Sequence, residues 1–268
     1  MGRRWQHEVS AEWLKARQQV LTATDVVNLM PEYKRYLKAG SPDTPSPGFS
    51  ALWCKKHSDV YLDTEAASSA AARGHIMEPY AVDSWNMQAS PTFYHWDDSI
   101  ICNNKFGFSP DAMTVPQEYI DPTIWVAANE KMYGERSQFY YRQPAEIMEI
   151  KCYEVTQHMK AIIEDHLEKK ELMQLAMAFV VLPKLESAKL LWFCPGAPIS
   201  MHVEEYTRDE LHDQIRWILE IGEVYEKADR YWADSLKSLP PKYAAKFTED
   251  EIYADYLSEH ERDVFLLK

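Results

Sequence analysis

The segment AEIMEIKCYE is an apolar run that contains a glutamate and a lysine two positions apart. In a β-strand, side chains alternate between faces, so Glu149 and Lys151 would project from the face opposite to Ile150. Two opposite charges on a strand that is covered on both sides carry a desolvation cost that something must compensate. The segment therefore indicates either an ion pair on an exposed strand or a site where a bound cation balances the charges.

A second acidic position lies upstream, in FGFSPDAMT, where Asp111 follows Pro110. Proline is awkward inside a paired strand, so we expect Asp111 at a strand end or edge, where a carboxylate can reach a cleft. The alternative is a turn aspartate, since Asp and Pro both favour turns. Carboxylates on adjacent strands suit Mg²⁺ or Mn²⁺, and a lysine beside them can orient a metal-bound water for attack on phosphorus. The pattern favours phosphodiester hydrolysis.

The overall composition restricts the class of protein. With 268 residues, 46% of them hydrophobic, the chain suits one large domain with a packed core. Its four cysteines form no CxxC pair, which argues against a zinc ribbon, an iron–sulfur cluster or a disulfide scaffold. No apolar run reaches the roughly 20 residues of a membrane span, and the start lacks the apolar stretch of a secretory signal. We therefore expect a cytoplasmic protein with no membrane partner.

The charge is unevenly distributed. A formal net charge of −13 would normally count against a nucleic-acid partner, because phosphate contacts need Lys and Arg. The segments GRR, KAR, YKRYLK and CKKH nevertheless make the first 60 residues more basic than acidic, whereas the sequence after about residue 200 is strongly acidic. Any nucleic-acid contact is therefore expected in the N-terminal part.

The N-terminal half is expected to contain short helices before the first strands. SAEWLKARQQV predicts a helix that begins at Ser10, and TATDVVNLM a second one capped by Thr24. AGSPDTPSPGFS (39–50) has the composition of a loop, and 64–86 is mainly helical in composition. Extended segments follow at TFYHW, FGFSPDAMTV and EIMEIKC.

The C-terminal half is expected to alternate helices with a strand pair. Apolar spacing predicts one long helix over about 157–182, which Pro183 ends. Two strands, AKLLWFC and ISMHVEEY, come next, and a capping box of Thr207 and Glu210 opens a last helix. This order predicts an α/β core with helical ends.

Together, SPDA (109–112) and EIK (149–151) resemble the two defining elements of the PD-(D/E)xK nuclease superfamily. More closely, the chain resembles the lambda exonuclease group of phage recombination nucleases, also called YqaJ-like viral recombinases. EWLKARQQVLTATDV is similar to the family's W-x3-R…[IL]TAS signature, with Trp13, Arg17 and Thr24 at the matching positions. RGHIME is similar to its G-x3-E helix motif, LMQLAMAF to its glutamine-containing helix, and LLWFCP…HVEEYTRDE to its closing strands and helix.

The resemblance implies a restriction-endonuclease-like PD-(D/E)xK core of the α/β (α+β) class, in which helices flank a central mixed β-sheet. The exonuclease domain would span 1–239, with the core over about 64–206 and helices that bind DNA ends over 10–30. Residues 240–268 would form a charged C-terminal extension for which the family provides no template.

The family's functional residues can be carried over to matching positions. The resemblance implies that Glu78, Asp111 and Glu149, with the main-chain carbonyl of Ile150, bind two Mg²⁺ ions, for which Mn²⁺ could substitute. Lys151 would activate or position water, and Gln174 would support Lys151 and the metal-bound water. Arg17 and Thr24, together with Trp13, would grip the 5′ phosphate of the digested strand. A predicted helix start at Thr24 suits an anion, and an arginine can bind phosphate through two parallel hydrogen bonds.

Each assignment has a structural alternative. Glu78 could be a solvated helix residue, Gln174 a core glutamine bonded to the backbone, and Arg17 a surface cation. The sequence also departs from the family. Tyr153 stands where relatives often have proline, Glu171 stands where they may have tyrosine, and some 37 residues separate Asp111 from Glu149. That insertion, rich in aromatic residues, could pack on itself, stack on unpaired bases or contact a neighbouring subunit.

The function that the resemblance implies is a Mg²⁺-dependent 5′ to 3′ exonuclease that digests one strand of linear double-stranded DNA. The 3′ single-stranded tails would serve phage-type homologous recombination in a bacterial host. A ring-shaped homotrimer and a single-strand annealing protein as partner are also implied. One alternative is an endonuclease or nickase on the same fold, and another is a DNA-binding recombination scaffold without catalysis.

Overall fold

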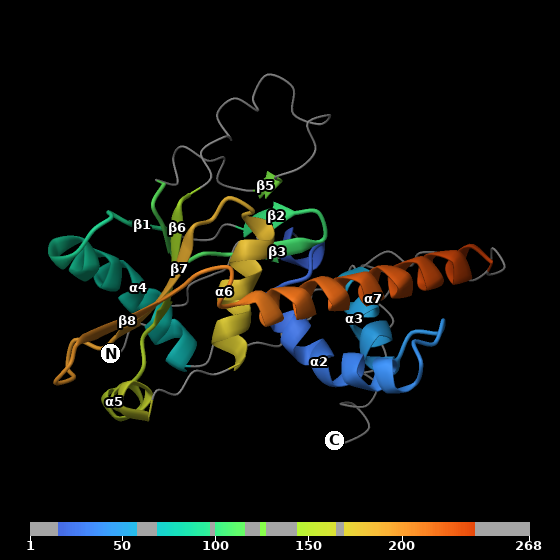
Figure 1. The fold of residues 1–268 in the computed structure, drawn as a ribbon, viewed down its shortest axis with the longest axis horizontal. Helices are drawn as coiled ribbons and strands as arrows, with labels where there is room; N and C mark the ends of the chain where they lie inside the picture. Colours follow the sequence, from blue (N-terminus) through green and yellow to red (C-terminus); the bar gives the residue numbers. More distant parts are fainter. Residues whose placement is uncertain are drawn as a thin grey trace, which may run out of the picture.

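The computed structural model describes residues 16–57, 69–96, 100–115, 124–126, 144–164 and 169–238. Figure 1 shows a central β-sheet with helices on both sides and a long helix, α7 (His212–Lys237), that runs away from the sheet. Trp13, the first part of the helix expected from Ser10, most of the aromatic insertion and the extension over 240–268 lie outside the described residues.

Five strands form the central sheet, in the spatial order β1, β4, β6, β7, β8. β6 and β7 pair in parallel and the other neighbours antiparallel, so the sheet is mixed. The strands are β1 (Tyr94–His95), β4 (Ala112–Met113), β6 (Glu146–Lys151), β7 (Ser187–Phe193) and β8 (Met201–Tyr206). Every residue of β7 is buried, as expected for an inner strand that is covered on both faces.

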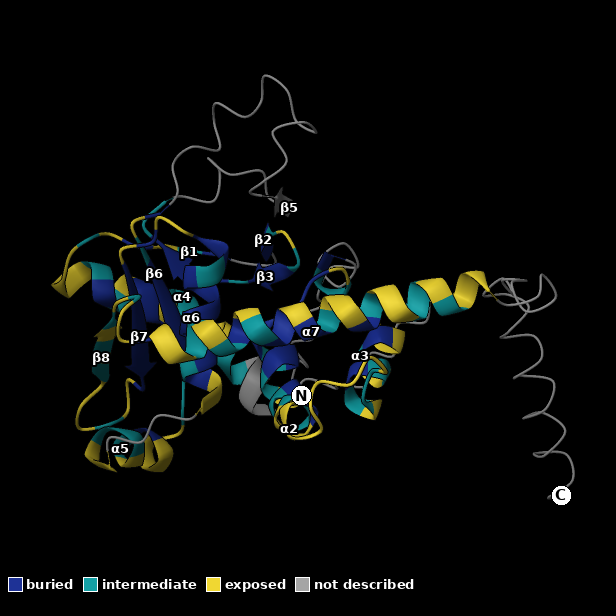
Figure 2. Cartoon of the chain, turned by 45° about the vertical axis from the view of Figure 1, so that its right-hand side comes forward, coloured by how far each residue is buried: buried dark blue, intermediate teal, exposed yellow. Residues whose placement is uncertain are grey.

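Helices cover both faces of β6. Ala81 and Val82 of α4 (Ser69–Gln88) belong to one buried cluster with Met148 and Ile150. Ile147 belongs to the larger cluster that includes α6 (Lys169–Val181) on the other face. Figure 2 shows β6 and β7 as largely buried between these helices. The alternation of strand side chains thus separates two cores, and the fold expected from the sequence, a mixed sheet flanked by helices, is confirmed.

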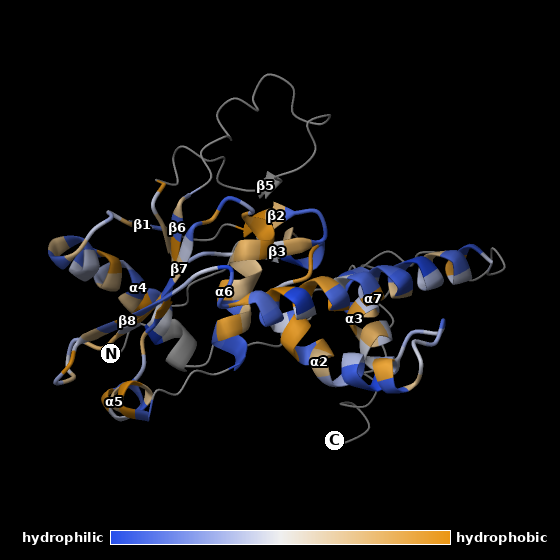
Figure 3. Cartoon of the chain, in the orientation of Figure 1, coloured by the Kyte–Doolittle hydropathy of each residue, from blue (hydrophilic) through white to orange (hydrophobic). Residues whose placement is uncertain are grey.

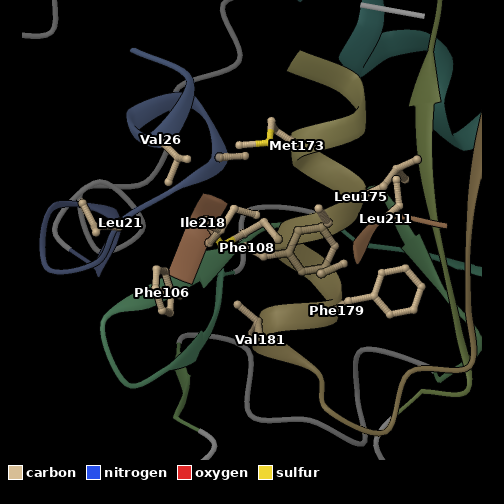
Figure 4. Close-up of a cluster of buried hydrophobic side chains, with 14 of the residues drawn as sticks. Leu21, Val26, Phe106, Phe108, Met173, Leu175, Phe179, Val181, Leu211 and Ile218 are labelled. Carbon is tan, nitrogen blue, oxygen red and sulfur yellow. The ribbon is translucent and has the colours of Figure 1, made fainter. Parts of the chain in front are cut away.

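The larger core is built around α6, which Figure 3 shows as mostly hydrophobic. A helix that is apolar on most sides must be surrounded by protein, and α2 (Ala23–Lys38) and α7 both pack on it. Figure 4 shows Val26 of α2, Met173 of α6 and Ile218 of α7 in this cluster. The helix α3 (Pro47–His57) packs in turn on α7, where Trp53 stacks on Trp232 with ring centroids 5.8 Å apart.

A small second sheet holds β3 (Phe106–Phe108), β2 (Ile100–Asn103) and β5 (Ile124–Val126), in that order. The sequence predicted one extended segment through FGFSPDAMTV, and it did not predict β2. The structure divides the segment between β3 of the small sheet and β4 of the central sheet. Pro110 lies between these two strands. Because proline has no N–H, it cannot donate a hydrogen bond to a neighbouring strand, and between strands none is required. Asp111 therefore stands immediately before β4.

The predicted cap of the second helix was wrong. Helix α2 begins at Ala23, and Thr22 is the N-cap residue, with a complete capping box between Thr22 and Asp25. A capping box needs a polar partner three residues after the cap, and Thr24 would have only Val27 at that position. Thr24 therefore lies inside the first turn of α2.

Three other helix boundaries differ from the prediction. In place of one helix over 157–182 there are two, α5 (Val155–Glu164) and α6, which lie apart in Figure 1. The bonds from Thr207 to Glu210 are present, but α7 begins only at His212. The segment read as a loop over 39–50 contains the start of α3, with Pro47 as its first residue, the position in a helix where proline is best tolerated.

Candidate active site

The two acidic motifs meet where β4 pairs with β6. Ala112 faces Met148 in the antiparallel register, so the next position along places Asp111 opposite Glu149. The Oδ2 atom of Asp111 accepts a hydrogen bond of 2.6 Å from the main-chain N–H of Ile150. Glu149 is only 4% exposed. Residues far apart in the sequence thus bring two acidic side chains together in a largely dry place.

Lys151 and Gln174 complete a triangle of polar contacts with Glu149. The Lys151 ammonium lies 2.6 Å from Oε1 of Glu149 and donates to Oε1 of Gln174 at 3.1 Å. The Gln174 amide nitrogen donates to the same Glu149 oxygen at 2.7 Å. Gln174 therefore bonds to side chains of the EIK motif, which differs from a core glutamine that satisfies the backbone. Glu149 and Lys151 both face α6.

Glu78 lies on the opposite helix, α4, and its side chain is 12% exposed. Its Oε2 atom is 3.5 Å from Nδ1 of His75, one turn earlier, and 3.7 Å from Nε2 of His95 on β1. Burial would raise the pKa of Glu78, but the two imidazoles outweigh it and lower the pKa to about 2. The site expected from the sequence included neither histidine. The short spacing of His75 from Glu78 was the available signal, and no local pattern pointed to His95.

Asp111 is where the negative charges converge. Burial raises the pKa of Asp111 well above its ordinary value, and the nearby charges of Glu149 and Glu78 raise it further. Lys151 and the Ile150 N–H oppose this shift without cancelling it. A cation bound here, in addition to the Lys151 ammonium, would reduce the repulsion between these carboxylates.

Lys151 remains protonated in this environment. Burial alone would lower its pKa, but the negative charges of Glu149 and Asp111 raise the pKa of Lys151 above the ordinary value. The side chain is therefore an ammonium that can donate hydrogen bonds and stabilise negative charge. Removing a proton from water would require a neutral amine, so its surroundings favour positioning over proton transfer.

The donor set fits a hard divalent cation in part. Asp111 and Glu149 offer carboxylate oxygens, the ligands that Mg²⁺ and Mn²⁺ prefer. Within the described part of the chain, no three His, Cys, Asp or Glu side chains are grouped closely enough to hold a metal ion. Glu78 would be a third carboxylate, and its Oε2 atom lies near His75 and His95.

Two of the residues expected to recognise a DNA end are described: Arg17 lies in the turn before α2, and Thr24 lies in the first turn of α2. Arg17 and Thr24 are half-buried, and Asp25, also in the first turn, is buried. Helix α2 packs on α6, and Val26 and Met173 belong to the same core. Since Gln174 follows Met173 and contacts the motif on β6, helix α6 lies between the two groups of residues.

The mixed sheet, with SPDA and EIK at facing positions and helices on both sides, is the arrangement expected of a PD-(D/E)xK core. Two crystal structures of LHK-Exo have this fold in common with the chain. One is LHK-Exo in complex with dAMP, with a TM-score of 0.53 and 16% identity, and it matches 86% of this chain and 100% of that one. The other is described as an alkaline exonuclease from Laribacter hongkongensis, with a TM-score of 0.51, 14% identity and the same coverage. No protein-family model and no curated protein matches the sequence.

Proposed function

We propose that the protein is a metal-dependent deoxyribonuclease that digests one strand of linear double-stranded DNA from its 5′ end. The observation that carries this proposal is the cluster of Asp111, Glu149, Lys151 and Gln174, which joins β4, β6 and α6 in one largely buried place. The LHK-Exo structure described as an alkaline exonuclease has the same fold, which supports an exonuclease activity for this chain. The net charge of −13 does not oppose it, because only the surface that contacts DNA must be positive.

Each residue of the cluster has a proposed task. Asp111, Glu149 and the Ile150 carbonyl would hold Mg²⁺ or Mn²⁺, with Glu78 as a further ligand of a two-ion site. When bound, the cation would supply Lewis-acid stabilisation and lower the pKa of water. Lys151, held as an ammonium, would donate a hydrogen bond to the attacking oxygen or to the scissile phosphate. Gln174 fixes the Lys151 and Glu149 side chains in one arrangement, which supports a role in positioning.

End recognition is proposed for Arg17, Thr24 and Trp13. A guanidinium can hold a 5′ phosphate through two parallel hydrogen bonds, and the first turn of α2 has main-chain N–H groups without helical partners. A grip on a 5′ phosphate is useful mainly to an enzyme that works from ends. This group therefore favours an exonuclease over a nickase with the same fold.

The biological setting that we propose follows from this activity. The 3′ single-stranded tails that remain would serve phage-type recombination, with a single-strand annealing protein as partner, in the cytoplasm of a bacterial host. A ring-shaped homotrimer would enclose the duplex. Among the described helices, none combines the length and the apolar character that a membrane span requires.

Three DNA substrates test the proposal in one experiment. The full chain is incubated with Mg²⁺ and a linear duplex that carries a 5′ phosphate, the same duplex with a 5′ hydroxyl, or a closed circle. We expect loss of the linear DNA only, faster from phosphorylated ends, with 5′-mononucleotides as products. Nicking of the circle would support an endonuclease instead, and no reaction on any substrate would support a DNA-binding scaffold.

A further inference from the structure

Lys56 is a buried lysine at the end of α3, outside the candidate active site. Its side chain is 8% exposed, and its ammonium lies 2.8 Å from Oδ2 of Asp25. It also donates to the main-chain oxygens of Arg17 at 2.9 Å and Val20 at 2.6 Å. A buried ammonium is costly unless its donors are satisfied, and here three N–H donors face three acceptors. The position of Lys56 is therefore closely fixed.

The turn from Arg17 to Val20 is held against α3 at more than one point. Besides the two bonds from Lys56, the Gln18 amide nitrogen donates to the Lys55 carbonyl oxygen at 3.2 Å. On its other side, Val20 packs with β2 in a small apolar cluster. The last turn of α3 thus holds the main chain of Arg17 in place.

Asp25 links the same lysine to the start of α2. Its Oδ2 atom accepts hydrogen bonds from the Thr22 N–H at 3.0 Å and the Thr22 hydroxyl at 2.9 Å. This oxygen is also the partner of Lys56. Lys56 therefore joins two segments: its hydrogen bonds hold the turn that carries Arg17, and its ion pair with Asp25 holds the helix turn that carries Thr24.

We propose that Lys56, through its pair with Asp25, is a positioning residue that sets Arg17 relative to Thr24 and thereby the discrimination between 5′-phosphorylated and 5′-hydroxyl ends. This inference rests on the proposed function. The Lys56 ammonium already has three acceptors, so it acts through Arg17 and does not itself contact the phosphate. A two-bond contact between guanidinium and phosphate depends on a narrow range of placement, so loosening the Arg17 main chain weakens it.

The test compares Lys56→Met with Lys105→Met in the full chain. Lys105 is a suitable control because it also forms an ion pair between elements, 2.7 Å from Glu226 on α7. Initial rates are measured in Mg²⁺ on linear duplexes with a 5′ phosphate or a 5′ hydroxyl. We expect Lys56→Met to reduce the preference for phosphorylated ends by about tenfold, the factor that corresponds to one good hydrogen bond. Lys105→Met should leave the preference unchanged.

Two additions keep the inference open to refutation. If Lys56→Met does not fold, as judged by thermal melting, Asp25→Asn replaces it and should lower the preference in the same direction. Binding of 5′-phosphorylated and 5′-hydroxyl oligonucleotides in Ca²⁺ provides a readout without cleavage. An unchanged preference in a folded variant, or an equal loss on both kinds of end, overturns the inference while leaving the nuclease proposal intact. A wild-type enzyme that shows no preference overturns the end-recognition proposal together with this inference.

Discussion

At the scale of single residues, the site contains buried charges whose desolvation cost is offset only by neighbouring groups. Burial would remove the charge of Lys151, but Glu149 and Asp111 preserve it. Burial, together with the charges of Glu149 and Glu78, raises the pKa of Asp111. The sequence could predict that these side chains meet, because the alternation along β6 and the position of Asp111 after a proline follow from local rules. It could not predict that His75 and His95 contact Glu78, because that depends on how α4 packs against β1.

Replacing Lys151 should remove catalysis and little else. We expect Lys151→Met to lower the rate of cleavage by about 10³-fold, the usual range for a group that assists proton transfer or charge stabilisation at the reacting centre. DNA binding in Ca²⁺ should persist. Lys189→Met is the matched control, since Lys189 lies on the next strand, is more buried than Lys151 and pairs with Glu146 at 2.6 Å. Near-normal cleavage by Lys151→Met, or an equal loss in both variants, would contradict the assigned role.

Metal binding should become more stabilising as the pH rises. A carboxyl group whose folded pKa is raised contributes stability that is present below its unfolded pKa, about 4, and is lost as the pH rises through the folded value. Asp111 is such a group, so the metal-free protein should lose stability over this range. A cation compensates the ionised form, so Mg²⁺ should raise the melting temperature more at about pH 8 than at about pH 5. Asp111→Asn should remove this difference, and a larger effect at the lower pH would refute the prediction.

At the scale of elements, side-chain pairs fix α6 against β6 at two points. Lys151 contacts Gln174, and the Tyr153 hydroxyl bonds to Glu171, which is one turn earlier on the helix and 2% exposed. In the sequence, Tyr153 and Glu171 appeared as two separate departures from the family pattern. The structure shows them as partners, so they form one feature of this chain. Sequence rules could not pair them, because the contact depends on the docking of a helix on a strand.

The threonines near the start of α2 should separate stability from end recognition. We expect Thr22→Ala to lower the free energy of unfolding by about 1 kcal/mol, the usual cost of losing an N-cap, because Thr22 caps the helix. Thr24→Ala should leave stability nearly unchanged and reduce the preference for 5′-phosphorylated ends. Denaturant unfolding and paired cleavage rates measure the two effects. If Thr24→Ala lowered stability and Thr22→Ala lowered the preference for phosphorylated ends, Thr24 would be the cap and would not have its proposed contact with phosphate.

Much of the element order could be predicted, and each error has a physical cause. Strands β6, β7 and β8 follow from apolar patterns that are strong within a few residues, and helix α4 follows from its helix-favouring composition. The single helix predicted over 157–182 failed because α5 and α6 have apolar residues at compatible spacing. Their division depends on the sheet, which α6 must cover while α5 packs elsewhere. The start of α3 was missed because its first turn is composed of residues typical of loops.

At the scale of the whole molecule, the acidic charge must be reconciled with a DNA substrate. A ring that is positive only in its channel would do this, and an acidic exterior would discourage binding outside it. We predict that the full chain sediments as a trimer, with three times the mass of one chain. Sedimentation equilibrium over a range of protein concentrations measures this. A stable monomer at micromolar concentration would contradict the ring.

The position of α6 between the two groups of residues has a consequence for the product. One side of this helix adjoins the start of α2, where the DNA end would be held, and another adjoins β6, where the bond would be broken. A helix that is buried over most of its surface keeps a fixed position, so α6 would hold a constant distance between the two groups of residues. The size of the fragment released at each step would then be set by the width of a single buried helix.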